Sequence, residues 1–223
     1  MTDPTPAAVV FDFDGLIFDS ETPIYVASAA AMATFGHELT IEAWATVVGH
    51  GDDDGWVALQ AAVGAELDRD AYEAAYAAQD RSWRDRQPAL PGVADLLAAL
   101  AAAEVPCGIA SSSPAAWVET HLERLALRHR FTSLATRDRV GGRAKPAPDT
   151  YLLACQDLGV DPAAAVAIED SAPGIAAARA AGLAVLCVPS EITRHTDLSA
   201  ADRHVADLTQ VTVADLASLA DRA

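Results

Sequence analysis

Two aspartates one residue apart, Asp12 and Asp14, follow a short apolar stretch near the start of the chain. Residues 7–11, with valine and phenylalanine prominent, predict a strand buried on both faces. An ionised carboxylate at the end of such a strand is costly unless a cation or a ligand compensates it. The pair therefore suggests a metal site, a nucleophile or both, although a turn between a strand and a loop explains the same residue types equally well.

Three further polar groups occur beside predicted strands and helices. They are Ser111-Ser112-Ser113, Lys145 in the segment KPAPD, and Glu169-Asp170. Because ligands of parallel α/β sheets collect at the carboxyl ends of the strands, we expect these groups and the aspartate pair to meet in one crevice. Each group alone also has a structural explanation, namely an N-cap at Ser113, a solvated surface lysine and a capping pair.

The combined set has a consistent chemistry. Four carboxylates offer the hard oxygen ligands that suit Mg²⁺: Asp12, Asp14, Glu169 and Asp170. Ser111, its neighbour Ser112 and the amides at the start of the next predicted helix form a cradle for an anion. Lys145, the only lysine of the chain, can neutralise a carboxylate or hold a phosphate. The sequence thus favours a site for a phosphate group together with Mg²⁺.

The elements that would position these residues alternate between strand and helix from residue 88 onward. Strands are predicted at 106–110, 131–135, 164–168 and 183–188, and helices at 91–104, from Pro114 on, 148–158, 173–181 and 213–219. This alternation predicts an α/β fold with a doubly wound parallel sheet, similar to a Rossmann-like core. The predicted core comprises residues 1–17 and 88–223.

Residues 18–87 contain no convincing strand. Alanine-rich stretches predict four helices there, at 25–35, 41–48, 54–63 and 70–86. We therefore expect an inserted, all-helical domain after the first strand. Its tryptophans, Trp44, Trp56 and Trp83, are interpreted as hydrophobic core of this insert, with contact between one of them and the organic part of a ligand as the alternative.

Composition narrows the classes of partner. The net charge of −17 over 223 residues argues against nucleic acid and against an anionic membrane surface. No apolar stretch reaches the roughly 20 residues of a membrane span, and the N-terminus lacks signal-peptide features, so we predict a cytoplasmic protein. Three cysteines without a paired motif predict reduced, buried thiols.

Four motifs in this order, DFDGLIFDS, ASSS, KPAPD and IEDSAPG, resemble those of the haloacid dehalogenase-like hydrolase superfamily. More narrowly, the chain resembles the phosphatases and phosphomutases with a small helical cap, the group of beta-phosphoglucomutase. The resemblance spans essentially the whole chain. It implies a Mg²⁺-dependent phosphatase for a small phosphorylated metabolite such as a sugar phosphate, working as a monomer or a weak homodimer.

The resemblance also implies roles for individual residues. Asp12 would be the nucleophile that forms an aspartyl-phosphate, and Asp14 the general acid and then the general base. Mg²⁺ would bind the Asp12 carboxylate, the main-chain carbonyl of Asp14 and Asp170, with Glu169 as a ligand or a neighbouring acid. Ser111 and Ser112, with Lys145, would hold the transferred phosphoryl group, and residues 18–87 would form the cap.

Residues at which this sequence differs from particular members of the superfamily limit the reactions that it can catalyse. Dehalogenation needs neither Asp14 nor the acidic pair, and phosphonate cleavage needs a cap lysine that this chain lacks. Mutases of this group carry a histidine at the position of Ile24 and basic cap residues for a second phosphate. Here the loop at 49–54 is acidic and would repel that phosphate, although His50 offsets part of the charge. Hydrolysis is therefore favoured, with a mutase and a non-catalytic binding protein as alternatives.

Overall fold

The computed structural model describes residues 5–50 and 52–221. Residues 1–4 and 222–223 of the predicted core, and Gly51 of the acidic loop, lie outside the described residues. Six parallel strands form one sheet in the order β3-β2-β1-β4-β5-β6. Their bounds are β1 Ala8–Phe11, β2 Cys107–Ser111, β3 Ser133–Thr136, β4 Ala165–Glu169, β5 Ala184–Cys187 and β6 Arg203–His204.

Strand β1 lies in the middle of the sheet, between β2 and β4. Phe11, the last residue of β1, is in register with Ile109 of β2 and with Ile168 of β4, and these two strands end shortly afterwards, at Ser111 and Glu169. Every residue of β1 is buried because successive side chains enter the cores on opposite faces of the sheet.

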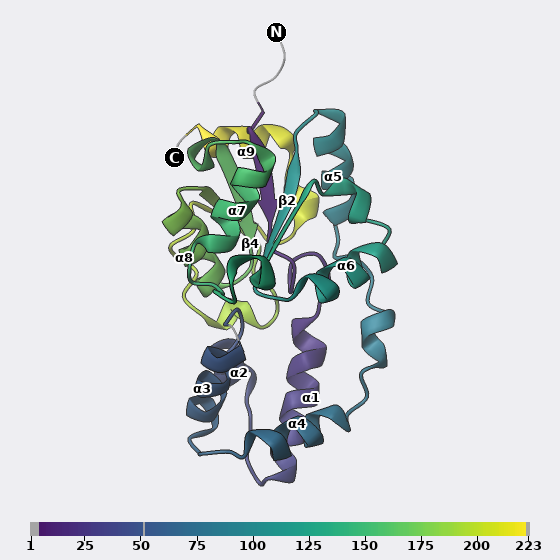
Figure 1. Cartoon of the computed structure of the whole chain (residues 1–223), viewed down its shortest axis with the longest axis vertical. Coiled ribbons are helices and arrows are strands. Elements are labelled where there is room, and N and C mark those ends of the chain that lie inside the picture. Colours follow the sequence, from purple (N-terminus) through teal and green to yellow (C-terminus); the bar gives the residue numbers. More distant parts are fainter. Residues whose placement is uncertain (1–4, 51, 222–223) are drawn as a thin grey trace.

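Helices cover both faces of the sheet (Figure 1). On the face of Val9 and Phe11 the core includes residues of α5 (Val93–Ala102), α6 (Ala115–Arg124) and α9 (Val213–Ala220). On the face of Ala8 and Val10 it includes residues of α7 (Asp149–Leu158) and α8 (Ala172–Ala181). The predicted doubly wound α/β fold is therefore confirmed. The three cysteines are free and buried, as predicted.

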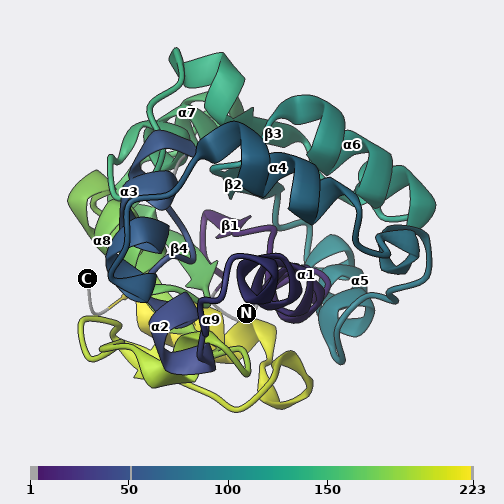
Figure 2. The same cartoon turned by 90° about the horizontal axis from the view of Figure 1, so that it is seen from below.

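The inserted segment forms a separate helical layer at the carboxyl ends of the strands (Figures 1 and 2). It consists of α1 (Glu21–Thr34), α2 (Ile41–Ala45), α3 (Asp52–Val63), α4 (Arg69–Ala77) and the short 3₁₀ helix η1 (Ser82–Asp85). The layer has a small core of its own around Met32, Trp44 and Leu59, which Ile192 enters from the loop after β5. The insert thus packs against the sheet domain at the carboxyl ends of the strands, beside the Asp12–Asp14 turn.

Several elements differ from the prediction, including the helix predicted at 41–48, which ends at Ala45. Helix α1 begins at Glu21 rather than Tyr25, because Pro23 is tolerated in the first turn of a helix. The helix predicted at 70–86 is divided into α4 and η1, since the Asp80 carboxylate accepts a hydrogen bond from the Ser82 amide at 2.8 Å. Strand β6 is short and was not predicted. Within the described residues, no helix combines the length and the apolarity that a membrane span requires.

The chain leaves and re-enters the sheet domain at one place. Phe18 forms isolated bridges with Asp14 and with Ala89, the residues before and after the insert. Its ring is fully buried and lies against Phe13, with ring centroids 5.4 Å apart. Both crossings are therefore anchored in the core beside the Asp12–Asp14 turn.

Candidate active site

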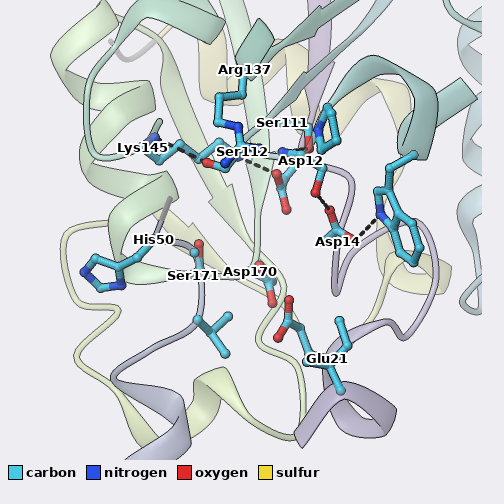
Figure 3. A pocket seen from close by; sticks show the side chains of 16 residues that line it. Asp12, Asp14, Glu21, His50, Ser111, Ser112, Arg137, Lys145, Asp170 and Ser171 are labelled. Atoms are coloured by element: carbon cyan, nitrogen blue, oxygen red, sulfur yellow. Dashed lines mark hydrogen bonds and ion pairs between the residues drawn. The ribbon is translucent and has the colours of Figure 1, made fainter. Parts of the chain in front are cut away.

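All the polar residues singled out in the sequence except Glu169 line one cavity of about 180 Å³ (Figure 3). Asp12 and Asp14 follow β1, and Asp170 follows β4. Ser111 is the last residue of β2, and Ser112 follows it. The cavity also includes Lys145, which precedes α7. These groups converge because β2 and β4 flank β1 in register, as the sequence argument expected.

Asp12 and Lys145 form a buried ion pair at the base of the cavity. The Lys145 side chain is only 2% exposed, and its ammonium also contacts Glu169 Oε1 at 2.5 Å. Burial raises the pKa of Asp12 from 3.8 to about 7; Glu169 adds to the shift and Lys145 opposes it. Burial alone would lower the pKa of Lys145, but Asp12 and Glu169 outweigh this and raise it. The lysine therefore stays charged.

Glu169 lies beneath the cavity and is completely buried. Its Oε1 atom accepts hydrogen bonds from Lys145 and from the Tyr151 hydroxyl at 2.6 Å. Its Oε2 atom accepts from the amides of Asp170 and Ser171, at 3.1 and 3.3 Å, and from the Ser171 hydroxyl at 3.2 Å. Protein donors thus hold both oxygens of this carboxylate in place.

Asp12, Glu169 and Asp170 form a cluster in which one carboxylate oxygen of each lies within 4.8 Å of the others. All three are buried. Burial, followed by the charge of Asp12, raises the pKa of Asp170 well above its ordinary value. One lysine does not balance three buried acids, and hard oxygen donors of this kind suit Mg²⁺. The donor set therefore fits a divalent cation.

The Asp14 carboxylate is oriented by three donors. Its Oδ1 atom accepts hydrogen bonds from the Ser20 hydroxyl and from the Trp117 indole, both at 2.9 Å, and its Oδ2 atom accepts from the Ser113 hydroxyl at 2.7 Å. The predicted N-cap at Ser113 is therefore wrong. Pro114 occupies the N-cap of α6, because the Ser113 hydroxyl is directed to Asp14 instead.

The serines at the end of β2 and directly after it form hydrogen bonds within their own turn and to the Lys145 segment. The Ser111 hydroxyl accepts a hydrogen bond from the Ser113 amide at 3.0 Å, which leaves its own hydrogen available to a ligand. The Ser112 hydroxyl accepts from the Lys145 amide at 3.3 Å and so ties the lysine segment to this loop. At the start of α6, the Ala115 amide donates to an Asp138 carboxylate at 3.1 Å.

Comparison with known proteins agrees with this arrangement. The family model described as haloacid dehalogenase-like hydrolase matches residues 6–182. The chain belongs to the haloacid dehalogenase-like hydrolases. Its membership accounts for the order of the four polar groups along the chain.

Two relatives of this hydrolase in Escherichia coli are similar over most of their length. Hexitol phosphatase B is 32% identical over 214 residues, which cover 94% of this chain and 96% of that protein. Fructose-1-phosphate phosphatase YqaB is 32% identical over 181 residues, covering 79% and 93%. The crystal structure of CbbY from Rhodobacter sphaeroides in complex with phosphate has a TM-score of 0.74 at 26% identity, covering 95% and 99%.

The hydrolase has cavity residues that the sequence did not reveal. They are Glu21, Trp117 and Arg137, which line the cavity together with the predicted groups. Nothing in the sequence marks Trp117, because its role depends on how α6 packs against the Asp14 turn. Glu21 had one usable signal: it is an acid in the first turn of the first insert helix. That signal was missed because the helix was predicted to begin four residues later.

Proposed function

We propose that this chain is a Mg²⁺-dependent phosphatase that hydrolyses a small phosphorylated metabolite, such as a sugar phosphate, through an aspartyl-phosphate on Asp12. The observation that carries the proposal is the buried contact of Asp12 with Lys145. Asp12 also belongs to the acidic cluster and lies in the same cavity as the oriented Asp14 carboxylate. The names of the relatives, a hexitol phosphatase and a fructose-1-phosphate phosphatase, support a phosphorylated polyol or sugar.

Asp12 and Asp170 would be direct ligands of Mg²⁺, together with the main-chain carbonyl of Asp14. Glu169 contributes the third carboxylate of the cluster while it also orients Lys145. When bound, the ion supplies positive charge that favours ionised Asp12 and neutralises the phosphate oxygens. Lys145 and the Ser111 hydroxyl would hold the remaining phosphate oxygens, and Ser112 would keep the lysine segment in place.

The reaction then takes place in two displacements. A carboxylate oxygen of Asp12 attacks phosphorus, the ester P–O bond breaks, and Asp14 protonates the departing alkoxide. In the second step, a water molecule attacks the aspartyl-phosphate, and the Asp14 carboxylate accepts its proton. Phosphate leaves and the Asp12 carboxylate is regenerated. Phosphoryl transfer requires mainly positioning and charge stabilisation, so this small set of groups suffices.

Residues 18–87 would act as the cap that closes the site and excludes water. The described cap residues that line the cavity are Glu21, Ile24, Val48, Gly49 and His50. None of these is a lysine or an arginine, so this part of the cap offers no strong partner for a second phosphate. The cap therefore supports hydrolysis of a monophosphate over a mutase reaction.

The test is a phosphate-release assay over a panel of phosphomonoesters with Mg²⁺, run beside a mutase assay primed with a sugar bisphosphate. Wild-type protein should release phosphate, and Asp12→Asn protein, shown to be folded, should lose at least a thousandfold in kcat because the nucleophile is absent. Wild-type release by the folded Asp12→Asn variant would refute the aspartyl-phosphate. Isomerisation of the sugar phosphate without release would favour the mutase.

A further inference from the structure

Aromatic and cationic side chains join helix α6 to residues 82–89, the return segment that leads from the insert back to the sheet domain. This segment runs beside α6 (Figure 1), and the Arg124 guanidinium on α6 donates a hydrogen bond to the Gln87 carbonyl at 2.6 Å. The rings of Trp83 in the return segment and Trp117 on α6 meet edge-on, with centroids 6.3 Å apart. The return segment is thus fixed against the helix that carries Trp117.

Arg84 of the return segment lies over the face of the Trp117 ring. Its guanidinium carbon is 5.3 Å from that ring centroid and 5.7 Å from the ring centroid of Trp83. Within residues 5–50 and 52–221, no carboxylate forms an ion pair with Arg84, and its buried Nε atom completes no hydrogen bond. A cation is attracted by the face of an indole ring. The two tryptophans are therefore the main partners of this half-buried charge.

The Trp117 ring connects this contact to the cavity. Its Nε1–H group donates to Asp14 Oδ1 at 2.9 Å, and Trp117 is one of the cavity residues. His121, one turn further along α6, lies against the same ring with centroids 4.1 Å apart. The indole is thus held by His121 from its own helix and by Arg84 from the return segment. Precise orientation matters here, because a displacement of about 1 Å in a reacting group costs up to a hundredfold in rate.

We propose that Arg84 is a positioning residue, which holds the Trp117 indole in the orientation that directs its Nε1–H group to Asp14. The proposal rests on the proposed phosphatase function, in which Asp14 protonates the departing alkoxide. Arg84 does not line the described part of the cavity, so its effect on the reaction passes through Trp117. Side chains that lock the rotamer of a functional group in this way determine how precisely that group is placed.

A purely structural role for Arg84 has different consequences. Loss of packing alone would lower the stability and slow all substrates equally. Loss of positioning slows the step in which Asp14 donates a proton to the leaving group. The loss then depends on how much each leaving group needs that proton.

The experiment measures kcat/KM, which covers the steps up to the aspartyl-phosphate, on two substrates. The first is the alkyl phosphate of the phosphomonoester panel with the highest wild-type kcat/KM, because an alkoxide needs a proton from Asp14 to leave. The second is p-nitrophenyl phosphate, whose phenolate leaves without one. Arg84→Met keeps most of the stem and removes the charge. It should lower kcat/KM for the alkyl phosphate about threefold with KM nearly unchanged, and that for p-nitrophenyl phosphate by less than about 1.5-fold. Arg84→Lys retains a cation over the ring and should stay within about 1.5-fold of wild type on both substrates.

A double-mutant cycle tests whether Arg84 acts through Trp117. Trp117→Phe should lower kcat/KM for the alkyl phosphate about tenfold, because it removes the donor itself. The double variant Arg84→Met/Trp117→Phe should show the same loss of about tenfold, whereas independent effects would give about thirtyfold. Arg86→Met is the matched control, since Arg86 is an exposed arginine of the same return segment and forms no cation–π contact with a described ring. It should leave both substrates unchanged.

Arg84→Gln is measured in parallel with the same expectation, so that a folding defect in one variant does not decide the result. Wild-type kcat/KM in the folded Arg84 variants, an equal loss on both substrates, or additive losses in the double variant would each overturn the proposal. If the wild-type protein released no phosphate from any member of the panel, the phosphatase function itself would be refuted.

Discussion

The metal-free protein should become more stable when Asp12, the proposed nucleophile, loses its charge. Asp12 is 6% exposed, and its pKa rises from 3.8 to about 7 on folding because of burial and then Glu169. A carboxyl group with a raised pKa binds its proton more tightly in the folded state than in the unfolded state. Its contribution to stability is therefore complete below pH 4 and is lost as the pH rises to about 7. Asp12→Asn removes this loss.

The size of the effect follows from the same pKa values. A change from 3.8 to about 7 corresponds to about 4 kcal/mol of unfolding free energy at pH 8. Rearrangement of the cluster and entry of water reduce this upper bound, and we expect about 2 kcal/mol. For a chain of this length that is an increase of about 4–8 °C in Tm.

The assay is thermal unfolding in EDTA at pH 5 and pH 8, with Glu66→Gln as the control for loss of an exposed carboxylate. The advantage of Asp12→Asn should be larger at pH 8. Adding Mg²⁺ should reverse the order, because the wild-type site binds the ion and gains about 2.7 kcal/mol at a hundredfold excess over Kd. An Asp12→Asn protein that melts at or below the wild-type Tm in EDTA at pH 8 would refute this account of the buried carboxylate.

Three further variants test particular contacts. Trp117→Phe removes one of three donors to Asp14 and should lower kcat about tenfold with KM nearly unchanged, measured by steady-state kinetics on the folded variant. A wild-type kcat in a variant whose Tm alone is lower would contradict this prediction. Gly174→Ala would place a Cβ 2.0 Å from the Glu169 carboxyl carbon, so Mg²⁺ titrations should show weaker binding and melting curves a loss of about 1–3 kcal/mol. Gly92→Ala, at a position with φ +84°, would place a Cβ 2.3 Å from the Leu208 carbonyl carbon and the Thr209 amide nitrogen. It should lower the urea midpoint while kcat and KM of the folded fraction stay unchanged, and an equal midpoint would count against the clash.

Much of the sheet domain could be predicted because its signals are local. Apolar stretches bounded by turn residues predicted β1, β2, β4 and β5, and the ends predicted for α7 and α8, at residues 158 and 181, are those observed, each followed by a left-handed glycine. Boundaries in the insert were less accurate. Its helices are alanine-rich and short, so single side-chain contacts such as the one from Asp80 decide where they end.

The sequence by itself determined the class of fold, the four polar groups and their order along the chain, because strand alternation and turn chemistry involve neighbouring residues. Only the tertiary structure decided which partners the side chains of those groups contact. The Ser113 hydroxyl donates to Asp14, which is 99 positions away in the sequence, and the Lys145 ammonium donates to Glu169, which is 24 positions away. Glu21 enters the cavity because the insert folds back over the sheet. Burial and the direction of a side chain depend on segments distant in sequence, and these set the charge and the hydrogen bonds of the site.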